Sequence, residues 1–351
     1  MLSDAPTALL RDLPGELWVH PQRIDLLRDA LLLVRVDARA LEQASFLDER
    51  IVTRDAAGWF NWSQLAQALA SGSAATPAHY LFHVGHCGST LVSRLLGELG
   101  ITQLREPLPL RTFAEVQADL DAFESRWSHA TFAARLPLLA ALFDRGSGPR
   151  AVKATSFCND LAPALLGTDP ARRATIVYTR LRTYVANVLA GANSRLDLLA
   201  AAPLRLKRLA ARTGHPVGRL HEMSPGVLAG LSWIAEMVSL AATLDAEPPG
   251  RVLAVDFDQF LADLRPALRQ LADHVAPGIE DAAIARTSIS PALTRYSKSP
   301  EHAYDLELRR AVLDDAERRF GAEIRDGLAW SAHLASRHPG VARALALFDR
   351  P

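Results

Sequence analysis

The sequence has little of several features that would assign a protein to a class at once. Its 351 residues include two cysteines, Cys87 and Cys158, too few for a disulfide framework. The 39 basic and 39 acidic residues balance, which argues against a nucleic-acid or anionic-membrane partner. Apolar runs such as 30–34 are far shorter than the ~20 residues that span a bilayer, and no basic-then-apolar leader opens the chain. We therefore expect a cytoplasmic protein that does not bind membranes.

Lysine is also scarce. Only three of the 39 basic residues are lysines, namely Lys153, Lys207 and Lys298. A compact ammonium and a planar guanidinium are not interchangeable in a tight site. Where arginine fills almost every cationic position, a lysine becomes a candidate for a functional role.

No internal repeat or low-complexity segment is present. Residues 1–76 predict a mostly helical and irregular N-terminal extension, which ends in the Ser-, Gly- and Pro-containing linker 71–77. Residues 77–351 predict a second domain, which ends in helices from about Ala303 onward. The sequence does not indicate an oligomeric state.

Short apolar segments alternate with helical patterns in this second domain. The alternation predicts a three-layer α/β fold with a central parallel sheet. Ligands of such sheets bind at the carboxyl ends of the strands, so residues that follow the strands should converge on one rim. The expected strands are 80–84, 101–104, 151–153, 174–178 and 252–255, and the expected helices are 91–99, 112–143, 183–190 and 226–244.

A glycine-rich loop follows the first of these strands. Its small residues would let main-chain N–H groups surround an oxyanion at the positive end of the next helix. An ordinary strand–helix turn with a Ser or Thr cap is the alternative. The loop lacks the lysine of the GxxxxGK[ST] pattern, which disfavours an ATP-dependent phosphotransferase. The loop residues are Gly85, His86, Cys87, Gly88, Ser89 and Thr90.

This loop resembles the 5′-phosphosulfate loop of the P-loop sulfotransferases, whose pattern is roughly [PG]-[KR]-S-G-[ST]-T. The departure is His86, which stands where the family has a basic residue and could still donate a hydrogen bond or carry charge. Glu106 lies twenty positions beyond His86, close to the offset of the catalytic glutamate in protein-tyrosine sulfotransferases, the most similar layout. Lys153-Ala154-Thr155 is similar to the family's K-x-[PT] segment, whose lysine neutralises the transferring group.

Later segments extend the resemblance over about residues 79–300. Arg180 ends a segment similar to the strand whose arginine binds the 3′-phosphate of the donor. The usual partner serine is absent, and Asn187 lies one residue before its position. Trp233 and 252–264 are similar to the family's late tryptophan helix and Y-E-D-L-x-x-D-P segment, and Lys298 lies in a basic stretch like the one that closes over the nucleotide.

The resemblance implies a P-loop NTPase-like fold and a sulfotransferase that uses 3′-phosphoadenosine 5′-phosphosulfate without a metal. The implied catalytic residues are Glu106 as general base, with Lys153 and His86 on the leaving group. The loop, Arg180, Asn187 and Lys298 would bind the donor, and the acceptor would be a hydroxyl or amine of a small molecule or peptide. Two alternatives stay open: a P-loop small-molecule kinase and a catalytically silent nucleotide-binding protein.

Overall fold

The computed structural model describes residues 4–49, 56–72, 76–298 and 301–350. The chain divides into two compact units. Unit 1 comprises 1–82, 92–175 and 268–288, and unit 2 comprises 83–91, 176–267 and 289–351. Part of the predicted linker 71–77 falls outside the described residues.

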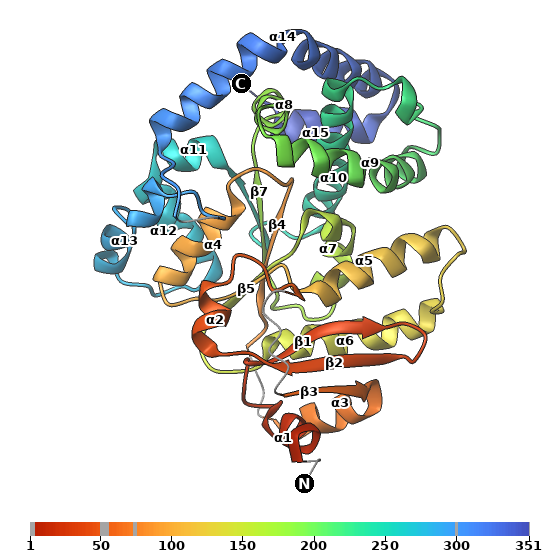
Figure 1. Ribbon diagram of the computed structural model, residues 1–351, viewed down its shortest axis with the longest axis vertical. Helices are drawn as coiled ribbons and strands as arrows, with labels where there is room; N and C mark the ends of the chain where they lie inside the picture. Colours follow the sequence, from red (N-terminus) through yellow and green to blue (C-terminus); the bar gives the residue numbers. More distant parts are fainter. Residues whose placement is uncertain (1–3, 50–55, 73–75, 299–300, 351) are drawn as a thin grey trace. The chain divides into compact units, whose positions relative to one another are not determined.

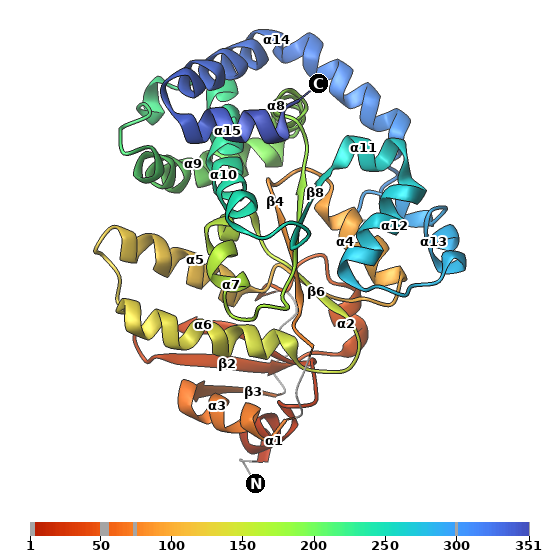
Figure 2. The same ribbon diagram turned by 180° about the vertical axis from the view of Figure 1, so that it is seen from behind.

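A five-stranded sheet has the order β5-β6-β4-β7-β8, which confirms the predicted α/β class with a central sheet. Strands β4, β5 and β7 of this sheet are labelled in Figure 1, and β6 and β8 in Figure 2. The pairs β5–β6 and β6–β4 are parallel. All five residues of β4 and all four of β6 are buried, as expected for strands of a parallel sheet. The strands are β4 (His79–His83), β5 (Thr102–Arg105), β6 (Arg150–Lys153), β7 (Ala174–Tyr178) and β8 (Val252–Asp256).

Helices alternate with these strands along the chain. Between β4 and β6 lie α4 (Ser89–Glu98), α5 (Leu108–Asp121) and α6 (His129–Asp144), and before β7 lies α7 (Ala162–Leu166). Between β7 and β8 lie α8 (Leu181–Ala190), α9 (Ala192–Thr213) and α10 (Pro225–Ala246). The remaining helices are α11 (Phe257–Ala262), α12 (Leu264–Val275), α13 (Asp281–Thr287), α14 (Leu306–Arg337) and α15 (Pro339–Phe348).

The single helix expected over 112–143 is wrong, since two helices occupy this stretch. The chain leaves α5 at Ala122, and Phe123 adopts a left-handed φ of 59°. The Ser128 side chain then accepts from the amide of Thr131 and caps α6. A continuous apolar periodicity hid both the turn and the new cap.

The N-terminal extension contains an antiparallel sheet that the sequence interpretation missed. It has the order β1-β2-β3, and helices α1, α2 and α3 accompany it. The pairing of β1 with β2 shifts between Pro21 and Arg23, so β1 lacks a regular alternation of polar and apolar residues. The bounds are α1 (Asp4–Asp12), β1 (Val19–Asp25), β2 (Ala30–Arg35), α2 (Ala38–Gln43), β3 (Ala57–Asn61) and α3 (Trp62–Ala70).

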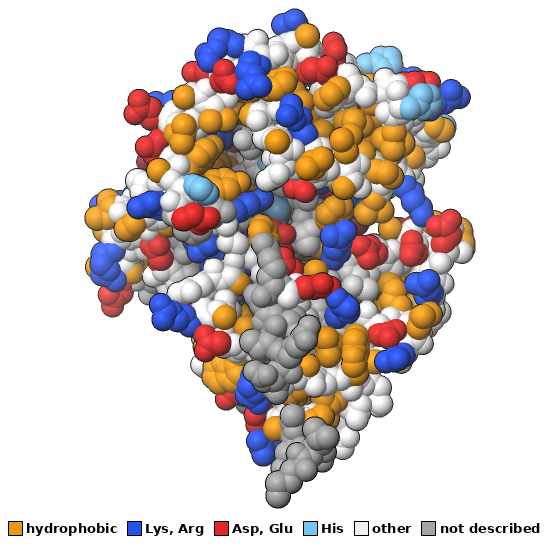
Figure 3. Space-filling model, viewed as in Figure 1, with side chains coloured by type: hydrophobic (Ala, Val, Ile, Leu, Met, Phe, Trp, Pro, Cys, Tyr) orange, Lys and Arg blue, Asp and Glu red, His pale blue; other side chains and the backbone are white. Residues whose placement is uncertain are grey.

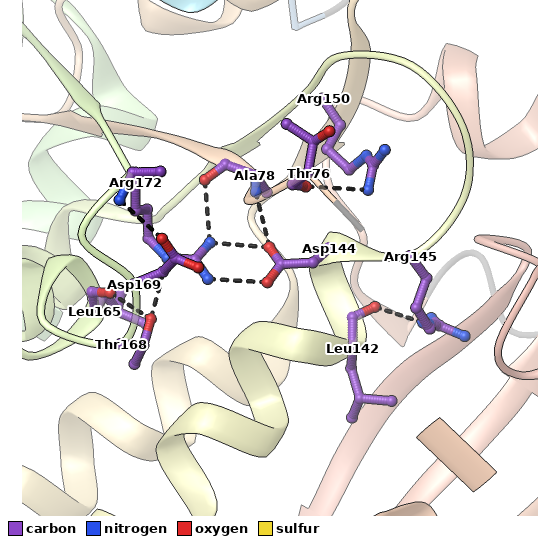
Figure 4. Close-up of polar contacts among 11 residues, drawn as sticks. Thr76, Ala78, Leu142, Asp144, Arg145, Arg150, Leu165, Thr168, Asp169 and Arg172 are labelled. Carbon is purple, nitrogen blue, oxygen red and sulfur yellow. Dashed lines mark hydrogen bonds and ion pairs between the residues drawn. The ribbon is translucent and has the colours of Figure 1, made fainter. Parts of the chain in front are cut away.

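In unit 1, the carboxylate of Asp144 joins segments that are distant in sequence. It accepts two hydrogen bonds from Arg172, both of 2.9 Å, and one of 2.7 Å from the amide of Ala78 (Figure 4). Arg172 also donates to the carbonyl of Ala78. The end of α6 is thereby fixed to the segments that enter β4 and β7.

In unit 2, α10 packs against α8, α9, α14 and α15 (Figures 1 and 2). By length and composition α10 could cross a membrane, but 78% of its apolar window is buried inside the protein. Such burial is expected of a core helix. On the face shown in Figure 3, Lys and Arg are interspersed with Asp and Glu, as expected from a net charge of zero.

Candidate functional site

The loop between β4 and α4 has an unusual main-chain conformation. Gly85, His86 and Gly88 have φ of 85°, 47° and 79°. Left-handed residues curl the chain, so that neighbouring N–H groups can face a common concavity. Helix α4 begins directly after the loop, at Ser89, and places its positive dipole end there. The loop therefore has the form of an oxyanion site.

Contacts within unit 2 hold this loop in place. The Asn187 side chain on α8 donates from Nδ2 to the carbonyl of His86 at 2.6 Å. The Cys87 thiol lies 3.2 Å from the carbonyl of Val177 on β7 and is buried, so this side chain packs between the loop and β7. Asn187 thus has a positioning role for the loop, while its predicted contact with a nucleotide stays a prediction.

The start of α11 connects the loop with Arg180. A Cβ on Gly88 would overlap the Phe257 ring, so this ring lies directly against the loop. Next to Phe257, Asp256 accepts from Nε of Arg180 at 3.0 Å and also caps α11 through the amide of Asp258. Asp256 therefore forms the capping turn that begins α11. Because Phe257 contacts the loop and the adjacent Asp256 pairs with Arg180, these two residues also orient Arg180 relative to the loop.

Two groups in this part of unit 2 have hydrogen-bonding capacity that the described residues do not use. The hydroxyl of Thr90 is buried without a partner among them, although Thr90 belongs to the first turn of α4. The Arg180 side chain is 33% exposed, and within the described ranges only its Nε has a hydrogen-bond partner. Its two Nη groups can therefore accommodate an anion in a fork geometry.

A second carboxylate influences Arg180. Asp349 accepts from the amide of Leu181 at 2.8 Å and so caps α8, whose N-cap residue Arg180 supplies no cap of its own. Burial raises the pKa of Asp349, although the Leu181 amide and the charge of Arg180 act to lower it. The C-terminal segment thus places a carboxylate in the electrostatic field of Arg180.

The surroundings of His86 favour the neutral imidazole, and so favour the hydrogen-bonding role over the charged role that the sequence left open. Burial, together with the charges of Lys298 and Arg205, lowers its pKa to about 3. Asp197 lies 3.9 Å from Nε2, but its side chain is 72% exposed, so solvent screens it. Nδ1 lies 3.2 Å from the hydroxyl of Ser194. His86 can therefore offer a hydrogen bond to a ligand but not a positive charge.

Lys298 lies close enough to His86 to affect its pKa, and so does Arg205 of α9. Within unit 2 the structure therefore groups the predicted loop with Asn187 and Lys298, and it connects Arg180 to the loop through 256–258. Sequence reasoning missed Arg205, Phe257 and Asp349. Nothing in their local sequence marks Arg205 and Asp349, and the resemblance of 252–264 did not single out Phe257, because only the fold brings these side chains to this region.

Glu106 and Lys153 form an ion pair in unit 1. Lys153 ends β6 with a side chain that is 1% exposed, and its Nζ contacts Oε1 of Glu106. The amide of Glu106 donates to the carbonyl of Lys153 at 2.6 Å, and Glu106 has a left-handed φ of 56°. The structure thus brings together the two residues that were predicted as base and cation. Their catalytic roles stay predictions.

No family model and no curated protein matches the chain. Among solved structures, it is similar to a sulfotransferase from Alicyclobacillus acidocaldarius, with 16% identity, coverage of 79% of this chain and 98% of the other, and a TM-score of 0.41. It is also similar to the sulfotransferase domain from the curacin biosynthetic pathway, with 14% identity, 71% and 99% coverage, and a TM-score of 0.37. A sulfotransferase from Mycobacterium tuberculosis has 14% identity, 74% and 80% coverage, and a TM-score of 0.37.

Proposed function

We propose that this protein is a sulfotransferase that transfers a sulfuryl group from 3′-phosphoadenosine 5′-phosphosulfate to a hydroxyl or amine. In this proposal the 85–90 loop holds the 5′-phosphosulfate and Arg180 holds the 3′-phosphate. The donor supplies the activated sulfuryl group. The protein binds and orients the donor, and it removes the proton of the acceptor.

The observation that carries the proposal is the loop with its neighbouring arginine. The left-handed loop residues, the start of α4 and the unpartnered Thr90 hydroxyl can together donate several hydrogen bonds to one oxyanion. Arg180 offers both Nη groups to a second anion. A donor with phosphate groups at both ends of one nucleoside matches two such sites, whereas the loop lacks the lysine expected for the γ-phosphate of ATP.

Charge near the loop is the main electrostatic contribution that this mechanism needs. Negative charge develops on the bridging oxygen of the leaving phosphate, and fixed donors and cations stabilise it. Because His86 is neutral, we assign the cationic contribution to Lys298, and His86 keeps the role of a hydrogen-bonding group. Asn187 keeps the loop in its binding conformation through the His86 carbonyl.

Glu106 is the proposed general base, and it takes the proton of the acceptor. Its pairing with Lys153 changes the role that we propose for this lysine. A side chain that is 1% exposed and contacts a carboxylate is better suited to orient that carboxylate than to contact the donor directly. We therefore propose Lys153 as the positioning residue of Glu106. The acceptor is a small molecule or a peptide.

A catalytically silent nucleotide-binding protein is a second candidate, and the neutral His86 favours it. With a pKa of about 3, the imidazole carries no charge at the loop position where a basic residue would assist the leaving group. This candidate shares the nucleotide site with the first but does not turn over the donor.

The first test is the binding of 3′,5′-diphosphoadenosine, compared with that of adenosine 5′-monophosphate. We expect the 3′-phosphate to tighten binding ~10-fold or more, because a charge-assisted hydrogen bond contributes ~1.5–3 kcal/mol. Arg180→Lys keeps a cation beside Asp256 but loses the forked donors, so most of this preference should disappear. Arg182→Lys is the control, since Arg182 is exposed and pairs with Glu317. Calorimetry that shows equal affinities for the two nucleotides would reject the donor assignment.

The second test separates the two candidates. Release of 3′,5′-diphosphoadenosine from the donor would be followed with a panel of phenols, amines and tyrosine peptides. We expect Glu106→Gln to lower turnover at least ~100-fold, the usual contribution of general base catalysis, with nucleotide affinity unchanged. Tight binding without release for any acceptor in the panel would favour the silent protein. Release that is unaffected by Glu106→Gln would remove Glu106 from the mechanism.

A further inference from the structure

A cavity of about 290 Å³ lies in unit 2, apart from the residues assigned to the nucleotide. It is bordered by the segment after α9 and by the end of α14 with the start of α15. Figure 3 shows histidine side chains at the upper right, where Figure 1 shows α9 and α14. The cavity is near the lower limit of small-molecule sites, which usually measure ~300–1,000 Å³.

The polar part of the lining consists of hydrogen-bond donors or groups that can become donors. It comprises His215, His333, Arg337 and His338, and no Asp or Glu of the described part of the chain lines the cavity. His333 and Arg337 are four residues apart, so they share one face of α14. The His215 and His338 rings lie 6.2 Å apart between centroids. The wall therefore suits a ligand with acceptor atoms and negative charge.

The rest of the cavity lining is apolar. Val217 and Leu334 are 8% and 5% exposed, and the Trp330 indole lies beside them. Buried aliphatic groups next to an indole favour the body of an organic ligand over a bare inorganic ion.

The donor groups of this wall are not used by the protein itself. Within the described ranges, the side chains of His215, His333, Arg337 and His338 make no hydrogen bond or ion pair. Arg343, on the neighbouring helix α15, shows the contrast: it makes two hydrogen bonds to Asp245. The described His, Cys, Asp and Glu residues also include no group of three placed to hold a metal ion, so the three histidines are not a metal site.

We propose that this cavity binds a small organic anion, with a carboxylate or phosphate group on an apolar body. The anionic group contacts Arg337 and the imidazoles, and the apolar body lies against Val217, Leu334 and Trp330. The site is separate from the nucleotide loop, and the proposal does not depend on the activity assigned there.

The test is an NMR titration of the imidazole signals of the full chain, with 3′,5′-diphosphoadenosine present to occupy the other anion site. The probes are benzoate, phenyl phosphate and benzyl alcohol. We expect saturable shifts of His215, His333 and His338 with one or both anions, and at least tenfold weaker binding of the uncharged alcohol. The relative affinities of benzoate and phenyl phosphate tell which anionic group the site prefers.

Arg337→Gln should weaken binding of the preferred anion about tenfold, because it removes a charge-assisted hydrogen bond. Arg325→Gln is the matched control, since Arg325 is an exposed arginine of the same helix outside the cavity. An equal effect of the two variants would show general charge attraction and reject the site. The site would also be rejected if the imidazole signals of the exposed His302 shifted as much as those of the cavity histidines, or if no signal shifted in a saturable way.

Discussion

Gly88 occupies a position where a side chain is excluded for two reasons at once. Its φ of 79° is costly for a residue with a Cβ, and the Phe257 ring occupies the space that a Cβ would need. The loop conformation and its contact with α11 therefore both require the absence of a Cβ at position 88. The same contact positions Asp256, the partner of Arg180.

Gly88→Ala should lower the free energy of unfolding by about 2–4 kcal/mol, as the sum of a left-handed φ and an overpacked contact. Gly100→Ala is the matched control. Gly100 has a φ of 83°, but nothing lies within 4 Å of an added Cβ, so only the ~1 kcal/mol conformational cost applies. Urea unfolding of both variants measures the difference. Equal losses would mean that the Phe257 ring does not constrain the loop.

At the scale of elements, α10 and α14 approach each other through small residues. A Cβ on Gly327 would overlap the main chain of Gly226, and a Cβ on Gly230 would approach Oγ of Ser331 to 2.9 Å. Gly226 and Gly230 share one face of α10, as do Gly327 and Ser331 on α14, because each pair is four residues apart. The amide of Gly226 also donates to the Glu323 carboxylate at 2.9 Å.

Gly327→Ala should destabilise unit 2 by about 2 kcal/mol or more, because two helix backbones must separate. In α15, Gly340→Ala meets only Cγ1 of Val238 at 3.8 Å. This control should be neutral or stabilising by about 0.5–1 kcal/mol, since alanine favours helix. Thermal unfolding would show the contrast. A stable Gly327→Ala variant would contradict the close packing of α10 with α14.

The Asp144–Arg172 pair illustrates how burial decides the energy of an ion pair between elements. Asp144 is 16% and Arg172 2% exposed at the side chain, whereas the similar Asp245–Arg343 pair is 41% and 49% exposed. Removing one partner of a buried pair leaves a desolvated charge without compensation. Solvent screens the exposed pair, so little is lost there.

Asp144→Ala should therefore cost about 3 kcal/mol or more, which includes the lost bond to the Ala78 amide. Asp245→Ala should cost less than about 1 kcal/mol. Denaturant midpoints of the two variants give both values. A similar small loss in both would show that Arg172 is compensated by other contacts.

At the scale of the whole molecule, three of the described histidines, His20, His79 and His86, have strongly lowered pKa values. Burial, assisted by the Arg145 charge, lowers the pKa of His20 to about 3. Burial also lowers the pKa of His79 well below its usual range, with smaller contributions from His274 and Arg173, and His86 behaves similarly. The unfolded chain binds protons at these histidines below about pH 6.5, and the folded chain does not. Stability is therefore lost as the pH falls from about 6.5 toward 3.

Between pH 7 and pH 5, His20 should lower the free energy of unfolding by about 2 kcal/mol, because its pKa in the folded chain is about 3. His20→Gln should reduce the loss by that amount. His302→Gln should not change it, because the His302 side chain is 72% exposed. Urea unfolding at the two pH values measures the slope. If His20→Gln shows the slope of the unchanged protein, His20 is not buried in the neutral form.

The parallel strands and the loop could be predicted because their signals are local. β7 occupies the predicted residues, and β4, β5, β6 and β8 lie within one or two residues of prediction. A fully buried strand needs a short apolar run, and a left-handed turn needs glycine, so both appear in the sequence. Strand β1 of the N-terminal sheet was missed, because the register shift between Pro21 and Arg23 disturbs its alternation.

The sequence by itself determined the α/β class, the position of the glycine-rich loop and the identity of Glu106, Lys153 and Arg180 as candidates, because each depends on residues close together in the chain. Only the tertiary structure decided the charge state of His86, the pairing of Lys153 with Glu106 and the contact of Phe257 with Gly88. Burial and charge pairing depend on residues that lie far apart in sequence. The physical reason is that desolvation and Coulomb energy are set by distance in space.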